Sequence, residues 1–277
     1  MHYFKTILNY IIYLNVVIAT SAGVLISGIT NLFGIENIIE YGFFGFFATF
    51  CVYNSHRLVK ASFETKTPWL KWVSRHKKLI LNLSVLSGLI SVLYFIKLIN
   101  EIRITIIALI IVAVCIAFFY VIRLGQKNIR ELPYLKIHSI AFTWTAIIVL
   151  FPIMNENVLN SQVLLYFIPA HYLYFMAIAI PFDIRDLKHD LPTQKTIPQV
   201  IGVKNAKILA VVLLIITALL INIYANSYLP IPLFLSAVLI QILLIISTKL
   251  TKKDFHYNIL IDGSIALLGA SYLGITN

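Results

Sequence analysis

Charged residues are scarce in this chain, and acidic residues are the scarcest of them. The 277 residues include 11 Asp and Glu against 22 Lys and Arg, so that 12% of the residues are charged while 60% are hydrophobic. Mean hydropathy is +0.91. A soluble globule must cover its surface with polar side chains, and this composition leaves too few of them. The composition therefore excludes a soluble domain and indicates an integral membrane protein.

Cysteines and polar linkers are also scarce. Cys51 and Cys115 each lie in an apolar stretch with no second cysteine nearby, so no disulfide or zinc site is expected. No low-complexity linker separates one part of the chain from another, and the longest polar stretches cover residues 57–78 and 183–207. We therefore expect one transmembrane domain over residues 1–277, with any function at a membrane face located in these two stretches.

Apolar runs long enough to cross a bilayer, roughly 20 residues each, recur along the whole chain. The nine runs cover residues 7–28, 38–54, 79–96, 104–122, 137–154, 159–180, 208–224, 231–247 and 259–275. Runs of this length and composition form helices in a membrane, because a helix satisfies its backbone hydrogen bonds internally. The expected fold is all-α, a polytopic membrane bundle of about nine helices.

The excess of positive charge follows this topology. All but two of the 22 basic residues, Lys97 and Arg103, precede the first run or follow an even-numbered one. Because cytoplasmic loops are enriched in Lys and Arg, we expect a cytoplasmic N-terminus and an external C-terminus. The loops that contain Glu64, Gln126 and Gln194 should then be cytoplasmic. The same pattern explains the net charge without a nucleic-acid partner, and the expected location is the cell inner membrane.

Three of the eleven acidic residues lie together in "PFDIRDLKHD". The spacings of three and four residues between Asp183, Asp186 and Asp190 place them on one face of a helix. Carboxylates crowded on one face repel one another, so a cation is a favourable partner. Mg²⁺ binds one or two protein carboxylates and completes its octahedral shell with water and phosphate oxygens. An interfacial charge cluster that orients the helix end is the alternative.

This segment, followed by "TIPQVIG", resembles the second aspartate-rich motif of the UbiA-type intramembrane prenyltransferases. The nine-span plan with a cytoplasmic N-terminus and the position of the motif after the sixth span are similar too. The resemblance implies Mg²⁺-dependent transfer of a prenyl group from a polyprenyl diphosphate to a lipophilic or aromatic acceptor, at the cytoplasmic face. It also implies that Asp183, Asp186 and Asp190 hold Mg²⁺ against the diphosphate.

The chain departs from the family pattern in the segment that corresponds to the first motif, "YNSHRLVKAS". Asn54 keeps the first position of the motif, and by resemblance it belongs to the catalytic set. Ser55, Leu58 and Ser62 occupy positions where acids are expected, while His56, Arg57 and Lys60 are basic. A guanidinium binds phosphate oxygens bidentately without a metal. We therefore expect Arg57 and Lys60 to bind substrate in place of a second metal ion.

The two motif segments also align with each other. A shift of 129 positions places Asn54 on Asp183 and Arg57 on Asp186, and the same shift matches Leu58 with Leu187, Lys66 with Lys195 and Thr67 with Thr196. Such internal repeats are common in polytopic proteins, where sites lie at the repeat interface. Chance similarity is the alternative.

Further candidates come from the loops on the same side. By resemblance, Tyr120 and Arg123 lie near the diphosphate, and Lys195 contacts phosphate. The enrichment of cytoplasmic loops in positive charge is enough to explain why Lys127 and Arg130 are basic. Asp262, an acid inside the last run, is expected to face the bundle interior as a site or structural residue.

Two other functions use the same features. A non-catalytic protein that binds an isoprenoid lipid fits the loss of acids from the first motif. A terpene cyclase on the same scaffold would need the same ionisation of a prenyl diphosphate, but no acceptor.

Overall fold

The computed structural model describes residues 2–63, 67–123, 125, 127–225, 230–251 and 254–274. Within these ranges every regular element is a helix, which confirms the expected all-α class. The N-terminal half contains α1 (His2–Tyr13), α2 (Val16–Leu32), α3 (Ile38–Phe63), α4 (Pro68–Arg75), α5 (Lys77–Leu98) and α6 (Ile104–Phe119). Glu64, Lys66 and Gln126, which the topology and repeat predictions include, lie outside the described residues.

The second half contains longer rods in which α- and π-helical segments alternate. These are η1 (Ile129–Glu131), α7 (Leu135–Trp144), η2 (Thr145–Leu150), α8 (Phe151–Asn155), η3 (Val163–Phe167), α9 (Ile168–Asp186), η4 (Pro192–Gln194), α10 (Ile197–Ala225), α11 (Ile231–Ser247), η5 (His256–Ile261) and α12 (Asp262–Leu273). Three of the short elements, η2, η3 and η5, are π-helical. Short π-helical segments of this kind often occur at functional sites.

Four helices of the described chain are long and apolar enough to cross a membrane: Lys77–Leu98, Leu135–Asn155, Val163–Asp186 and Ile197–Ala225. Val16–Leu32, Ile104–Phe119 and Ile231–Ser247 are shorter apolar helices. Together they support an integral membrane protein. The nine-span topology, the orientation and the inner-membrane location stay predictions.

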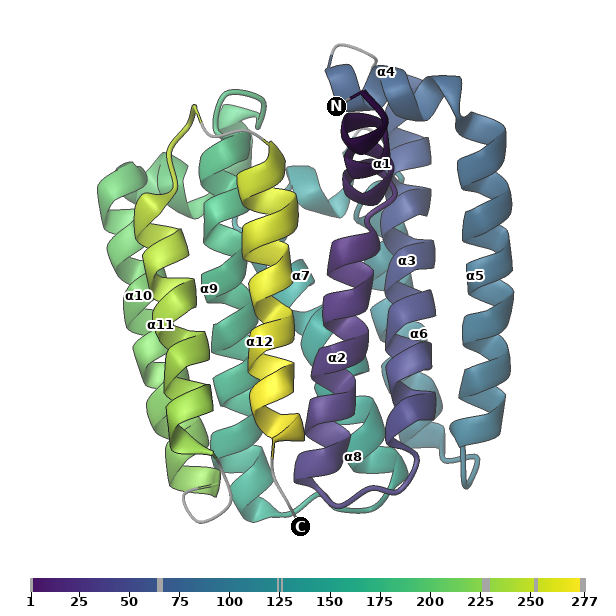
Figure 1. Cartoon of the computed structure of the whole chain (residues 1–277), viewed down its shortest axis with the longest axis vertical. Helices are drawn as coiled ribbons and strands as arrows, with labels where there is room; N and C mark the ends of the chain where they lie inside the picture. The colour runs from purple at the N-terminus through teal and green to yellow at the C-terminus, as the bar shows by residue number, and fades with distance from the viewer. Residues whose placement is uncertain are drawn as a thin grey trace.

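The helices run side by side along the long axis of the molecule (Figure 1), and their contacts arrange them as an open ring around the interior. Neighbours in contact follow the order α5, α3, α2, α12, α11, α10, α9, α7, α6, so that α2, near the start of the chain, packs against α12, near its end. Leucine, isoleucine and valine side chains point away from this interior, as Val85, Leu86, Leu89 and Leu93 of α5 do, each at least 54% exposed. Apolar outer faces of this kind are what a bilayer solvates.

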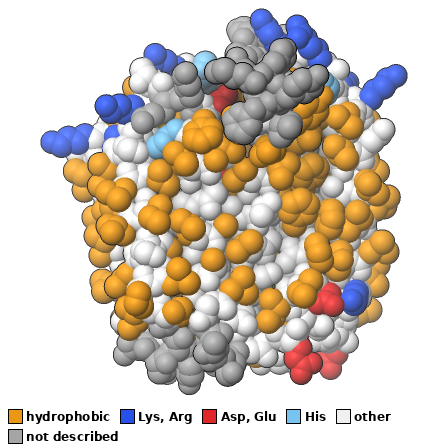
Figure 2. Space-filling view, in the orientation of Figure 1, with side chains coloured by type: hydrophobic (Ala, Val, Ile, Leu, Met, Phe, Trp, Pro, Cys, Tyr) orange, Lys and Arg blue, Asp and Glu red, His pale blue; other side chains and the backbone are white. Residues whose placement is uncertain are grey.

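The outer surface carries its charges at the two ends. Figure 2 shows Lys and Arg gathered at one end, apolar side chains over the middle, and most of the visible Asp and Glu at the other end. Lys97 and Arg103, the two basic residues outside the general pattern, pair with Glu40 and Glu101. The charge asymmetry expected from sequence thus exists in space, along the direction of the helices.

Two predicted boundaries were wrong. The first apolar run is not one helix, because α1 ends at Tyr13 and Asn15 adopts a left-handed backbone (φ 56°) before α2 begins. The second helix continues nine residues beyond the predicted end of its span, to Phe63. Arg57 and Lys60 are therefore held on a helix and not in a loop.

Candidate functional site

A cavity of about 500 Å³ lies inside the ring of helices. One set of lining residues is apolar or aromatic and includes Ile18, Tyr53, Ile116, Trp144, Phe175 and Ile178. A second set of lining residues is charged, and we call it the charged end: Arg57, Lys60, Arg130, Lys136, Asp183, Arg185, Asp186, Asp254 and Asp262. The cavity thus combines an apolar chamber with a charged end formed by residues from both halves of the chain.

The three aspartates of the sequence motif converge, although they do not lie on one helix. α9 ends at Asp186, and Asp190 follows in a turn whose backbone N–H donates to the Asp186 carbonyl over 2.9 Å. Asp183 and Asp190 are buried, and the side chain of Asp186 is 17% exposed. We call these three residues the aspartate cluster. The turn, and not a continued helix face, brings the third carboxylate to the other two.

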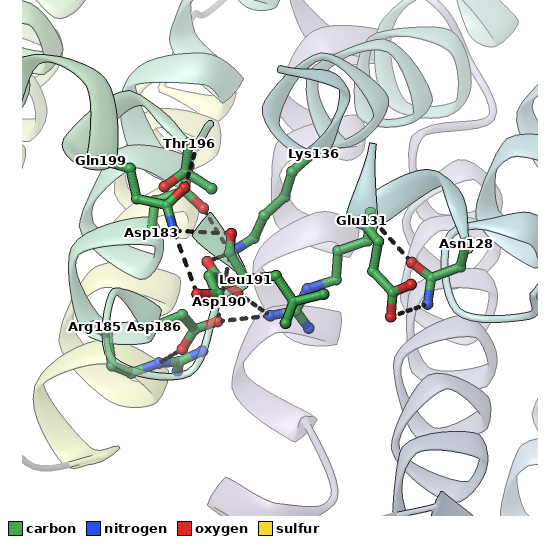
Figure 3. A network of polar contacts seen from close by, with 11 residues as sticks. Asn128, Glu131, Lys136, Asp183, Arg185, Asp186, Asp190, Leu191, Thr196 and Gln199 are labelled. Carbon is green, nitrogen blue, oxygen red and sulfur yellow. Dashed lines mark hydrogen bonds and ion pairs between the residues drawn. The ribbon is translucent and has the colours of Figure 1, made fainter. Parts of the chain in front are cut away.

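A lysine from another helix lies among the three carboxylates (Figure 3). Lys136 is the second residue of α7, and its Nζ lies 2.9 Å from Asp183 Oδ1 and 3.7 Å from Asp186 Oδ2. The same ammonium donates a short hydrogen bond to Asp190 Oδ2. Its side chain is 5% exposed. A single buried cation is therefore shared by all three acids.

Two arginines complete the charge balance of the cluster. Arg130 Nη2 lies 2.9 Å from Asp190 Oδ1 and 3.3 Å from Asp186 Oδ2, and Arg185 Nε donates to Asp186 Oδ1 over 2.8 Å. Burial alone would lower the pKa of Arg130, but Tyr120 and the two carboxylates raise it above its ordinary value. Arg130 therefore remains a cation at physiological pH, and three acids face three bases.

The cluster can be tested against the Mg²⁺ ion that the resemblance implies. Carboxylate oxygens are suitable ligands for Mg²⁺, and Asp183 Oδ2 is a buried oxygen with no hydrogen-bond partner in the described part of the chain. However, the Lys136 ammonium contacts the same three carboxylates that would hold the ion. A divalent cation does not fit among them together with this ammonium. The residues thus have the right donor chemistry, but the position between them is taken.

Sequence reasoning missed both Lys136 and Arg130, which the positive charge of inner loops explained equally well. One signal was available for Lys136: it directly precedes an apolar run, within a helical turn of His138 and Ser139. A lysine there is held at the end of a span and cannot move freely, as a loop lysine can. For Arg130 we find no such signal, because it lies among other basic residues in a polar loop.

The turn after the cluster is anchored by the glutamine half of a capping box at the start of α10, while the Thr196 hydroxyl has no hydrogen-bond partner among the described residues. Thr196 precedes the helix, its N–H donates to Gln199 Oε1 over 2.9 Å, and the Gln199 amide donates to Leu191 O over 3.1 Å. Lys195 has a left-handed backbone (φ 48°), a conformation that glycine adopts at lower cost.

Asn54 and Arg57 together bind the backbone at the break between α1 and α2. Arg57 Nη1 donates to the carbonyls of Ile12 and Tyr13 over 3.2 and 2.8 Å, and Asn54 Nδ2 donates to Leu14 O over 2.8 Å. Asn54 is fully buried, and it also accepts a hydrogen bond from Asn15. Asn54 does not line the cavity, whereas Arg57 does. The first motif therefore has a structural function at this break.

The remaining predicted residues divide between the cavity and its surroundings. Tyr120 lines the cavity and stacks on His56, and Lys60 lines it with its Nζ 5.4 Å from the centre of the Trp69 ring. Arg123 is 59% exposed and pairs with Glu131, away from the cavity. Lys195 lies over the Tyr134 ring and lines a separate pocket of about 50 Å³ behind Lys136.

Asp262 faces the cavity from the start of α12, directly after the π-helical segment η5. It is 9% exposed, and among the described residues its carboxylate has neither a hydrogen bond nor an ion pair. Asn258, one turn earlier, also lines the cavity, and its Oδ1 accepts a long hydrogen bond of 3.5 Å from Arg185. An acid that is buried without a partner is costly, so Asp262 is available to a ligand.

Comparisons of the chain with protein-family models, curated proteins and solved structures give no match. The functional argument therefore depends on the residues of the cavity.

Proposed function

We propose that this chain is an integral membrane prenyltransferase that binds a polyprenyl diphosphate in the central cavity and transfers the prenyl group to a lipophilic or aromatic acceptor. The observation that carries the proposal is the division of one cavity into an apolar, aromatic chamber and a charged end. A ligand with a long apolar chain and a compact anionic head matches this division. The volume of about 500 Å³ lies in the usual range for small-molecule sites, roughly 300–1,000 Å³.

Two guanidinium groups with open donors support binding of the anionic head. The aspartates bind Arg130 through Nη2, and the α1 carbonyls bind Arg57 through Nη1. Within the described chain, the other nitrogens of both side chains have no protein acceptor. Each can therefore donate to phosphate oxygens without giving up the contacts that position it. Their origin in α3 and η1 would place the diphosphate between two walls of the cavity.

The reaction would begin with cleavage of the C–O bond between the prenyl C1 and the diphosphate, whose oxygen keeps the electron pair. Arg57 and Arg130 would stabilise the negative charge that grows on the leaving group, and fixed donors of this kind are the main source of rate in such steps. The acceptor nucleophile would form the new bond to C1 and release a proton. Asp262, which has no hydrogen-bond or ion-pair partner among the described residues, would bind the acceptor and take that proton.

The alternative is a non-catalytic protein that binds an isoprenoid lipid, and the pairing within the aspartate cluster favours it. Three acids and three bases already neutralise one another there. A charge-balanced cluster can hold α7, η1 and α9 together without chemistry. Release of diphosphate from bound ligand separates the two functions, because only the transferase or a cyclase breaks the C–O bond.

The first test is ligand binding by the purified protein in detergent. Farnesyl diphosphate should bind at least about tenfold more tightly than farnesol or inorganic pyrophosphate, because only the ester uses both parts of the cavity. Arg130→Ala should weaken binding by about 1.5–3 kcal/mol, the value of hydrogen bonds to charged groups. Each affinity is measured by isothermal titration calorimetry with MgCl₂ and again with EDTA.

Arg123→Ala is the matched control, since it removes an arginine of the same connection that lies away from the cavity. It should leave the affinity unchanged. Equal affinities for farnesol and farnesyl diphosphate, or equal effects of the two variants, would contradict the proposed ligand.

A further inference from the structure

Among the basic residues of its end of the molecule whose burial the structure describes, Lys136 is the one that is buried. Its side chain is 5% exposed, while Lys188, in the same turn as Asp190, is exposed to solvent. A buried ammonium loses its hydration and is stable only where carboxylates replace it. Lys136 has three such carboxylates, all contributed by the segment from Asp183 to Asp190. General enrichment of positive charge at one membrane face does not produce this geometry.

We propose that the Lys136 ammonium takes the position of a divalent metal ion among Asp183, Asp186 and Asp190, so that the site holds its anionic ligand without Mg²⁺. The claim that the anionic ligand binds without Mg²⁺ rests on the proposed function, whereas the claim that Lys136 takes the position of a metal ion does not. The cluster needs a cation because its acids are close together and mostly buried. Lys136 supplies that cation from within the chain.

The charge balance explains why the ammonium and a metal ion exclude each other. Arg130 and Arg185 each contact the cluster in addition to Lys136, so the three acids are already neutralised. A divalent ion at the same oxygens would lie within a few ångströms of the ammonium and repel it strongly in these buried surroundings. Without the ammonium, the carboxylate oxygens that it contacts would be available to bind a metal ion. Asp183 Oδ2, buried and without a hydrogen-bond partner, would then be an additional ligand.

The experiment uses Mn²⁺ as the probe, because its electron paramagnetic resonance signal reports binding directly and needs no prenyl ligand. The full-length protein in detergent is titrated as wild type, Lys136→Ala, Lys136→Met and Lys188→Ala. Lys136→Met keeps most of the apolar volume of the side chain, so at least one variant should remain folded. Lys188→Ala removes a lysine of the same end that lies outside the cluster.

Both Lys136 variants should acquire one Mn²⁺ site with an affinity at least about tenfold higher than that of wild type, because a like charge has been removed. Adding Asp183→Ala to Lys136→Ala should abolish that site. Mn²⁺ should also raise the melting temperature of Lys136→Ala more than that of wild type or Lys188→Ala.

Two outcomes overturn the inference. One is a wild-type Mn²⁺ site that Asp183→Ala abolishes, because the cluster would then hold a metal with the lysine present. The other is a folded Lys136 variant that binds Mn²⁺ no better than wild type.

The claim that the ligand binds without Mg²⁺ is tested by measuring the affinity of wild type for farnesyl diphosphate in EDTA and in MgCl₂. The two affinities should be equal. Binding that occurs only with MgCl₂ overturns metal independence while the proposed function stands. No binding under either condition contradicts the proposed function, whereas the Mn²⁺ titration still decides the role of Lys136.

Discussion

Arg57 and Asn54 both bind the backbone at the break between α1 and α2, but they differ in their access to the cavity. At this break, these two side chains donate to three successive carbonyl groups, those of Ile12, Tyr13 and Leu14. Satisfying freed carbonyls is a general requirement for an interrupted helix in a membrane. Only Arg57 also reaches the cavity. The two residues should therefore respond differently to substitution.

Arg57→Ala should weaken binding of farnesyl diphosphate by about 1.5–3 kcal/mol and also lower thermal stability, because both sets of hydrogen bonds involve a charged group. Arg57→Lys should recover only part of the affinity, since an ammonium lacks the planar fork. Asn54→Ala should lower stability without changing the affinity. The measurements are calorimetric affinity and thermal unfolding followed by circular dichroism.

Lys71→Ala, an exposed lysine of α4, is the control for Arg57 and should change neither quantity. If Asn54→Ala weakens binding as much as Arg57→Ala while the protein remains folded, Asn54 belongs to the site, as the motif predicts. If Arg57→Ala and Lys71→Ala have equal and small effects, the first motif does not contact the ligand.

At the scale of elements, the contact between α2 and α12 joins the first part of the chain to the last. The two helices pack through glycines: a Cβ on Gly28 would lie 2.2 Å from the Gly269 carbonyl oxygen, and one on Gly269 would lie 2.6 Å from Leu25 Cα. Small residues at a helix interface let two backbones approach closely, which is a main source of helix association in membranes. Since Asp262 and Ile18 belong to these same helices, their contact also shapes the cavity.

Gly269→Ala should destabilise the protein by about 1–3 kcal/mol, because the added methyl group meets backbone atoms that cannot rotate away. The change is measured as reduced stability in thermal or denaturant unfolding. Gly263→Ala is the matched control on the same helix, since its Cβ would be 3.5 Å from the Val17 side chain, an ordinary contact. Equal stability of the two variants would show that α2 and α12 separate without cost.

At the scale of the whole molecule, the separation of charge between the two ends is the property that bears on orientation (Figure 2). The charged end of the cavity lies at the basic end, because the ends of α3 and α9 and the start of α12 meet there. If positive loops are cytoplasmic, the site is open to the cytoplasm. Substrate and diphosphate product would then exchange on that side of the membrane.

The orientation can be tested by cysteine labelling in intact cells, after Cys51 and Cys115 are replaced by alanine. Lys188→Cys should react with a membrane-impermeant maleimide only after the cells are opened, and Ser161→Cys should react from outside. Both positions are exposed in the structure, whereas Gln194 is buried. Labelling of Lys188→Cys from outside would contradict the cytoplasmic location of this loop. It would also contradict the cytoplasmic location of the N-terminus, which follows from the same topology.

The amino-acid sequence alone predicted the membrane class, the all-helical fold and most of the segments that become helices, because these depend on composition and on the length of apolar runs. It also identified Asp183, Asp186 and Asp190 as one group, since residues three and four positions apart remain close in a helix or a tight turn. Arg57 was recognisable as a basic residue in the segment that corresponds to the first motif, where the repeat alignment places it on Asp186.

What only the tertiary structure decided is the partner of each charge. Lys136 and Arg130 belong to α7 and η1, and they meet the aspartates only because α7 packs against α9. Local sequence does not encode such contacts between distant segments, and one positive residue of an inner loop resembles another until the chain is folded. Likewise, Asn54 became a structural residue only through a helix break that apolar periodicity could not reveal. Burial then gives these charges their roles, because an ammonium or amide removed from water must have a specific partner.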